Sequence, residues 1–221
     1  MRLAPPRPAR TPLTWVAVTC TALTLAAAAG AQEDPAARSE SFSASERADL
    51  EAGRLVVRRS TRHRGQARMI GGSAWQVVSH SPDVTWRALT DADHYSAMLP
   101  AAEDTRVVAH SPGERVVRVR HAVGLVHASY HLRLTYDHAQ RDIAFRLDRQ
   151  RPNDLRAAWG FLSVAPWGDD DEHALISYGV MADLGGGLFS GLMRSELHEW
   201  LLRVPETVRT YLDGPGGRRY Q

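Results

Sequence analysis

Cysteine, lysine and long apolar runs are scarce or absent in this sequence. Cys20 is the only cysteine, and every basic residue is arginine. Because Cys20 lies in an N-terminal segment that we expect to be removed, the mature chain can form no disulfide. It also carries no thiol for catalysis, redox chemistry or metal binding. After residue 31 no apolar run reaches bilayer-spanning length, which predicts a soluble mature protein without a membrane span.

The first 31 residues have the pattern of a secretory signal peptide. Three arginines and no acidic residue precede an apolar stretch at 13–29, and Ala29-Gly30-Ala31 offers a small-x-small cleavage site. We therefore expect export, with cleavage after Ala31, to a periplasmic or secreted location. The alternative is a retained anchor, because the stretch of about 17 residues is at the lower limit for a bilayer span.

Removal of the signal changes the charge balance. It takes three of the 27 basic residues and none of the 25 acidic ones, which leaves 24 against 25. The isoelectric point of 9.0 for the whole chain is therefore no indication of a nucleic-acid partner, and we expect none. The remaining length of about 190 residues suits one domain with its own core.

The N-terminal half of the mature chain predicts a leader followed by a strand and two short helices. Residues 32–72 are expected to be a leader whose short helix begins at the capping box Ser43-x-x-Glu46. The domain itself is expected at 73–213 and opens with a strand near 73–80. Ser81 and Pro82 then suit the start of one helix, and Pro100 ends a second.

Six further strands are expected at steady spacing, without helices between them, which is typical of an antiparallel meander. We place them at 103–110, 114–122, 125–136, 141–149, 155–166 and 172–182. In the second and third strands, alternation gives one apolar face and one polar face. The polar face carries Arg118, Arg120, His127, Ser129 and His131. A turn at Val123-Gly124 would place Val119 opposite Ala128.

The last predicted element is a long helix at 188–212, preceded by three glycines at 185–187. Its apolar residues recur every three or four positions and form one broad stripe. Pro205 is expected to kink the helix. Because this stripe is the only large apolar surface left, we expect it to cover the apolar face of the sheet. Residues 214–221 are expected to be a disordered tail.

This order of elements, and three stretches of sequence, resemble the START-like or SRPBCC superfamily. Its members include polyketide cyclases/dehydrases, lipid-transport proteins and coenzyme Q-binding START-type proteins. The stretches are 75–100, 157–166 and 201–212, and in the first the resemblance is carried by Val77, Val78, Ser81, Pro82, Trp86, Leu89, Asp91, Tyr95, Leu99 and Pro100. The resemblance implies an α+β helix-grip fold, in which a curved antiparallel sheet of six to seven strands wraps around the long C-terminal helix. It also implies a hydrophobic cavity between sheet and helix.

Such a cavity would bind a hydrophobic small molecule, of lipid or quinone-like type, without a cofactor. The residues that we expect to line it are Val119, His121, Tyr130, Phe145, Trp159, Phe161, Tyr178, Phe189, Leu192 and Met193. A non-enzymatic carrier is one hypothesis. A cyclase, dehydrase or hydrolase that uses His121 with Tyr130 or Tyr178 as acid–base groups is another. A third is an interaction module filled by its own side chains, which a cavity below about 300 Å³ would favour.

The sequence gives no motif for metal binding or nucleophilic catalysis. The ten histidines are scattered, and His127 and His131 would lie about 13 Å apart along a strand, too far for one ion. The acidic run at 169–172 lacks the spacing of a calcium loop. No Gly-x-Ser-x-Gly elbow occurs. We therefore expect no metal and assign no catalytic residue.

Overall fold

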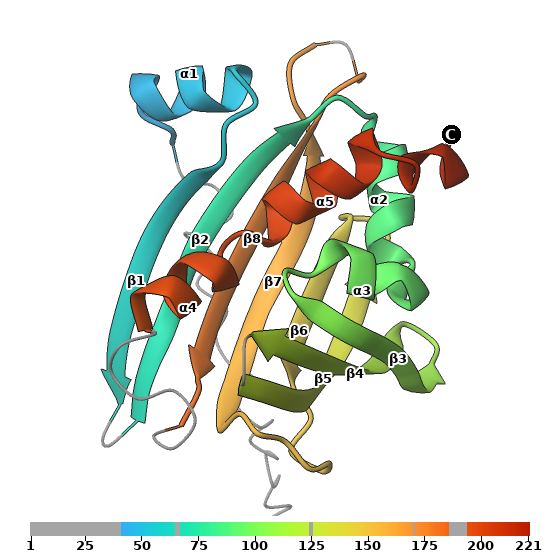
Figure 1. Cartoon of the computed structure of the whole chain (residues 1–221). Coiled ribbons are helices and arrows are strands. Elements are labelled where there is room, and N and C mark those ends of the chain that lie inside the picture. The colour runs from blue at the N-terminus through green and yellow to red at the C-terminus, as the bar shows by residue number, and fades with distance from the viewer. Residues whose placement is uncertain (1–40, 65–66, 124–125, 170, 186–193) are drawn as a thin grey trace, which may run out of the picture. The chain divides into compact units, whose positions relative to one another are not determined.

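A curved antiparallel sheet of eight strands forms the scaffold of the domain (Figure 1). This computed structural model describes residues 41–64, 67–123, 126–169, 171–185 and 194–221. The strands lie in the order β1-β2-β8-β7-β6-β5-β4-β3. Their bounds are β1 Val56–Arg64, β2 Ala67–Val78, β3 Ala102–Ser111, β4 Glu114–Val123, β5 Val126–Asp137, β6 Asp142–Leu147, β7 Ala157–Pro166 and β8 Ala174–Asp183.

The alternation of side chains gives this sheet an apolar inner face. In β4 the valines at 117 and 119 are buried, whereas Arg118 and Arg120 point to the other face, where they pair with Asp104 and Glu103. Because successive side chains on a strand point to opposite faces, the Val-Arg alternation of β4 produces this separation. The predicted meander is confirmed, and the sheet has eight strands where six to seven were expected.

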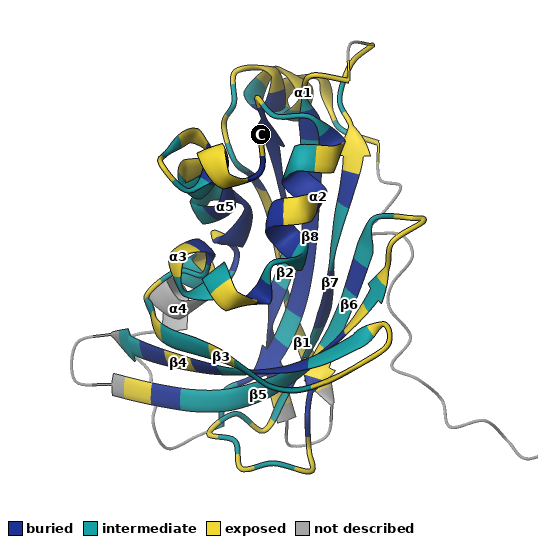
Figure 2. Ribbon diagram, turned by 90° about the vertical axis from the view of Figure 1, so that its right-hand side faces the viewer, coloured by how far each residue is buried: buried dark blue, intermediate teal, exposed yellow. Residues whose placement is uncertain are grey.

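The helices between β2 and β3 begin where the local sequence indicates. α2 (Pro82–Thr90) has Ser81 as its N-cap, whose side chain accepts a hydrogen bond from the backbone of Val84, and Pro82 lies in its first turn. η2 (Ala92–His94) and α3 (Tyr95–Met98) follow. α2 buries Trp86 and Leu89 against the inner face, and Figure 2 shows its buried side turned to the sheet.

A separate short helix packs on the outer face. α1 (Ala44–Glu51) starts with the predicted capping box, in which Ser43 and Glu46 bond each other's backbone. Leu50 of α1 joins Val56, Trp75 and Val77 in a small apolar cluster. Because β1 and the whole of β2 belong to the sheet, the folded domain starts earlier than the expected boundary at residue 73.

Two helices, rather than one long helix, cover the inner face near the C-terminus. They are α4 (Arg194–Leu201) and α5 (Val204–Asp213). Pro205 lies in the first turn of α5, where its missing N–H costs no helical hydrogen bond, so the chain breaks and restarts instead of kinking. Both helices lie across the inner face of the sheet in Figure 1. No helix in the described ranges is long and apolar enough to cross a membrane.

The C-terminal residues differ from the expected disordered tail. After α5 the chain forms η4 (Gly217–Arg219) and then buries Tyr220, which is 6% exposed. The Tyr220 hydroxyl donates a hydrogen bond of 2.9 Å to Asp91 Oδ2 at the end of α2. A polar and glycine-rich tail offers no periodic signal, so this contact could not be anticipated from composition.

The register of the β4–β5 hairpin differs from the predicted one by two residues. Val119 pairs with Tyr130, and Val123 pairs with Val126. A shift of two residues leaves every side chain on its original face, because the side-chain period of a strand is two. The predicted apolar and polar faces are therefore correct although the predicted pairs are not.

Candidate ligand-binding cavity

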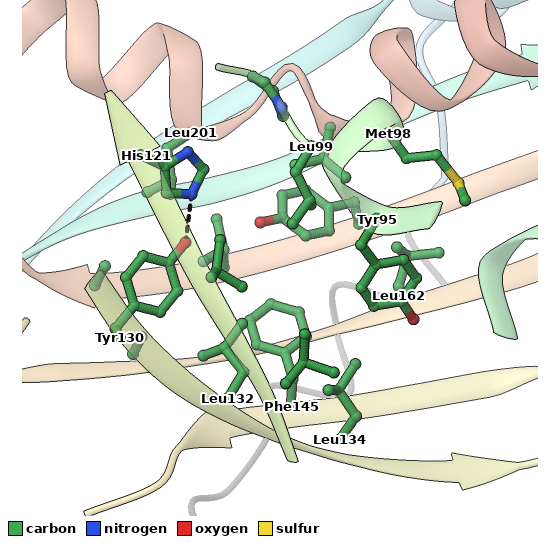
Figure 3. Close-up of a pocket in the computed structure, with 18 of the residues that line it drawn as sticks. Tyr95, Met98, Leu99, His121, Tyr130, Leu132, Leu134, Phe145, Leu162 and Leu201 are labelled. Carbon is green, nitrogen blue, oxygen red and sulfur yellow. Dashed lines mark hydrogen bonds between the residues drawn. The ribbon is translucent and has the colours of Figure 1, made fainter. Parts of the chain in front are cut away.

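A cavity of about 140 Å³ lies between the inner face of the sheet and the helices that cover it (Figure 3). Strands β4 to β8 provide one wall. α2, α3, α4 and α5 provide the other. The lining residues share an apolar character: Leu89, Tyr95, Met98, Leu99, Pro100, Val117, Val119, His121, Ala128, Tyr130, Leu132, Leu134, Ile143, Phe145, Leu155, Ala158, Leu162, Tyr178, Val180, Ala182, Leu184, Trp200, Leu201, Val204 and Val208.

A glycine makes room for one aromatic side chain in this wall. Gly160 of β7 pairs with Phe145 of β6, and a Cβ at Gly160 would come 2.4 Å from the Phe145 ring. The Phe145 ring therefore occupies space that any larger residue at 160 would take. Phe145 also stacks on Tyr178, with ring centroids 6.0 Å apart. The two rings form an aromatic part of the sheet-side wall.

His121 and Tyr130 form a buried polar pair in the cavity wall. His121 Nε2 lies 2.7 Å from the Tyr130 hydroxyl oxygen (Figure 3). The His121 ring also packs edge-on against Trp200, with centroids 4.6 Å apart. Nδ1 of His121 is buried without a well-formed hydrogen bond to a described residue. Burial lowers the pKa of His121, although the carbonyls of Ala101 and Pro100 oppose this shift. The imidazole is therefore held neutral.

The tyrosines of the cavity are neutral as well. Burial raises the pKa of Tyr130, and burial together with the proximity of Tyr130 raises that of Tyr178. The Tyr95 pKa is also raised, chiefly by burial, and its hydroxyl donates a 2.6 Å hydrogen bond to the Leu89 carbonyl. Since the described lining holds no Arg, Asp or Glu, the cavity carries no charge at neutral pH.

Five of the ten residues predicted to line the cavity do so. They are Val119, His121, Tyr130, Phe145 and Tyr178. The other strand residues, Trp159 and Phe161, do not. In β7 it is Ala158 and Leu162 that reach the cavity, so the odd-numbered residues face the other side of the sheet.

This placement corrects the predicted phase of β7 by one residue. Phe161 fills the space beside Gly179 on that other face. The remaining predictions, Phe189, Leu192 and Met193, lie outside the described residues.

The helix-side residues that line the cavity in the described ranges were not among those predicted for the site. They include Tyr95, Met98, Leu99 and the C-terminal residues Trp200, Leu201, Val204 and Val208. A signal for several of them was present, because Trp200, Val204 and Val208 belong to the apolar stripe of the predicted helix. That stripe indicated burial against the sheet, but periodicity does not distinguish a packed contact from a cavity wall.

A second, polar cleft of about 650 Å³ lies at the end of α2, next to the β3–β4 turn. It is more open, and several of its charged groups already have partners. Asp91 binds Tyr220 and His94, and the Arg115 guanidinium donates to the Thr90 carbonyl. In the described ranges no group of three or more His, Cys, Asp or Glu residues could hold a metal ion. The apolar cavity, which is the less open of the two, is therefore the better candidate for a binding site.

The comparison with family models agrees with the fold and the cavity. Residues 78–203, more than half of the chain, match the family described as polyketide cyclase / dehydrase and lipid transport. The chain belongs to this family. Membership supports a function of hydrophobic-ligand binding or of polyketide-cyclase type, and it confirms the resemblance that residues 75–100 indicate. A comparison with curated proteins finds no match.

Solved structures with the same fold come from several bacteria. The Zhui aromatase/cyclase from Streptomyces sp. R1128 is 20% identical, with a TM-score of 0.55 over 69% of this chain and 96% of its own. A STAR-related lipid transfer protein from Xanthomonas axonopodis is 15% identical, with a TM-score of 0.54 over 71% and 99%. The protein TTHA0849 from Thermus thermophilus is 18% identical, with a TM-score of 0.53 over 66% and 94%. At these identities the likeness establishes the fold alone.

Proposed function

We propose that this protein is a non-enzymatic carrier or sensor that binds a hydrophobic small molecule in the cavity between the sheet and α3–α5. The observation that carries the proposal is the lining, which among the described residues is apolar except for a histidine and three tyrosines. Small-molecule sites are commonly concave and apolar, with a few placed polar groups. Membership of a family that includes lipid-transport proteins supports the same function.

The cavity volume limits the size of the ligand. At about 140 Å³ the cavity falls below the range of about 300–1,000 Å³ for drug-sized ligands. Volume alone thus favours a cavity filled by the protein's own side chains. However, an apolar cavity of about 150 Å³ is large enough to bind benzene. The ligand that fits the cavity is therefore of single-ring size, and a lipid chain or quinone tail would extend beyond these walls.

A second candidate function is acid–base catalysis of cyclase or dehydrase type. The hydrogen bond between His121 and Tyr130 favours it, because a neutral histidine can accept a proton from a substrate. In the structure, however, Nε2 of His121 and the Tyr130 hydroxyl bond each other, and this bond would have to open before either of these two atoms could reach a reacting group. The carrier function requires no such rearrangement and is the better supported of the two.

We also propose that the protein is exported. Support comes from the charged N-terminus, the apolar stretch at 13–29 and the small residues at 29–31. The test is N-terminal sequencing of the protein recovered from the medium and the cell envelope. Export with processing predicts a chain that begins at Gln32, and an exported chain that begins at Met1 would contradict cleavage.

Binding is tested by isothermal titration of the mature chain, residues 32–221, with p-xylene as a neutral single-ring probe. We expect saturable binding with a stoichiometry near one. Hexadecanoate serves as a long-chain comparison that should bind more weakly, because its chain exceeds the cavity and its carboxylate finds no cation among the described lining residues. If no probe of ring size binds up to its solubility limit, the carrier function is contradicted.

A further inference from the structure

The three tyrosine hydroxyls in the cavity wall differ in their hydrogen bonding. Tyr95 donates to the Leu89 carbonyl, and Tyr130 shares a hydrogen bond with His121. Tyr178, whose side chain is almost wholly buried, has no hydrogen-bond partner among the described residues although it lines the cavity. Tyr178 is thus the one cavity tyrosine whose hydroxyl remains available in the part of the chain that the structure describes.

An available hydroxyl in an apolar cavity has a physical consequence. Buried tyrosine hydroxyls usually find a partner, because a buried polar group without one loses the hydrogen bonds it made to water. Tyr178 lies at the centre of the sheet-side wall, between Ala74 and Leu162 on the neighbouring strands. Its ring is held by stacking on Phe145. A fixed ring presents the hydroxyl at a defined point, which is suited to orienting a ligand.

The charge of the lining restricts the ligand further. The described lining includes no arginine, and His121 is neutral. A carboxylate placed among these side chains would lose its hydration without gaining a cation, which is strongly unfavourable. A neutral oxygen, such as a hydroxyl or a carbonyl, would meet no such penalty.

We infer that the ligand is a neutral, single-ring-sized molecule with one hydrogen-bonding oxygen, and that the Tyr178 hydroxyl binds this oxygen. The inference rests on the proposed function, because it specifies what the same cavity binds. It adds a specificity-determining residue and excludes anionic ligands such as fatty acids and aromatic carboxylates.

The test compares two probes of nearly equal shape, p-cresol and p-xylene, which differ by a hydroxyl in place of a methyl group. Dissociation constants are measured by titration calorimetry for the mature chain and for Tyr178→Phe. The preference for p-cresol over p-xylene should fall roughly 2- to 12-fold in Tyr178→Phe, the factor that corresponds to one hydrogen bond. Binding of p-xylene itself should persist. Tyr211→Phe is the matched control, and its preference should equal that of the parent, because the Tyr211 hydroxyl bonds that of Tyr220 and Tyr211 is not among the lining residues.

A second measurement requires no substitution. Tyrosine labelled with ¹³C at Cζ reports on its own hydroxyl, and the Tyr178 signal of the parent should shift more with p-cresol than with p-xylene. An unchanged preference in Tyr178→Phe together with equal shifts would overturn the inference and leave the proposed function standing. Binding of neither probe would overturn both. Binding of 4-methylbenzoate as tight as that of p-cresol would overturn the exclusion of anions.

Discussion

The Nε2 atom of His121 lies 2.7 Å from the hydroxyl oxygen of Tyr130, on the wall of an apolar cavity. His121 comes from β4 and Tyr130 from β5. In this hairpin Val119 pairs with Tyr130, and His121 pairs with Ala128, so His121 lies two positions along β4 from the residue opposite Tyr130. The pair is therefore diagonal across the hairpin, within the reach of long side chains. The pair is polar but uncharged. Because burial disfavours the protonated form of His121, the stability of the fold depends on pH.

Acidification should destabilise the protein through His121. Its pKa in the folded state is lowered from the ordinary value of 6.5, so below about pH 6.5 the unfolded chain takes up a proton here that the folded chain does not. Stability from this residue is complete above pH 6.5 and is lost as the pH falls towards the lowered folded-state pKa, by at most about 1.4 kcal/mol per pH unit. Urea denaturation at pH 7, 6 and 5 should show a smaller loss for His121→Gln than for the parent. Equal losses would show that His121 titrates normally in the fold.

A large residue at position 119 should block the cavity. Val119 is 1% exposed and lines it from the middle of β4. Val119→Trp should abolish p-xylene binding, while overpacking costs about 1–3 kcal/mol of stability. The control is Val57→Trp on the edge strand β1, where the side chain is 37% exposed and does not line the cavity. Equal p-xylene affinity in the parent and both variants would place the binding site elsewhere.

Trp200 should contribute less to stability than a wholly buried tryptophan. It is partly buried and packs on His121. Truncation of a fully buried tryptophan costs about 3–5 kcal/mol, so we expect roughly 1–3 kcal/mol for Trp200→Ala by urea denaturation. Glu199→Ala is the neighbouring control, since Glu199 is exposed and its 3.6 Å ion pair with Arg59 is worth little. Indistinguishable free energies of unfolding for the two variants would mean that α4 does not pack on the sheet.

The C-terminal contact of Tyr220 should be measurable. Tyr220→Phe removes the hydrogen bond to the Asp91 carboxylate and should lower the free energy of unfolding by about 1–3 kcal/mol. Arg218→Ala, a change at an exposed residue of the same tail, should have little effect. If Tyr220→Phe is as stable as the parent, the tail does not dock on α2 in solution.

The fold was predictable because its signals are local and repeated. The Val-Arg alternation of β4 and the turn residues between strands gave the meander, and Ser81-Pro82 gave the start of α2. The break between α4 and α5 was less predictable. Pro205 disfavours a helix interior and favours a first turn, and the sequence alone does not choose between a kink and a new helix.

The candidate site was only partly predictable. Alternation placed Val119, His121 and Tyr130 correctly because the β4–β5 phase is marked by charged residues on the opposite face. β7 has no such marker, since the sequence Ala157–Pro166 carries no charge, and its phase was assigned one residue off. The short distance between His121 and Tyr130 depends on the register of the hairpin. The predicted turn gave a register two residues away from the observed one, so it did not predict this distance.

Native mass spectrometry of the mature chain shows most directly whether a small molecule binds in this cavity. The parent and Val119→Trp would be purified without detergent, incubated with p-cresol and analysed by electrospray ionisation under native conditions. Binding in this cavity predicts a one-to-one complex with p-cresol for the parent and none for Val119→Trp, while both proteins keep the same charge-state distribution. A parent that remains free of ligand at saturating p-cresol, or a Val119→Trp variant that binds it equally, would contradict binding in this cavity.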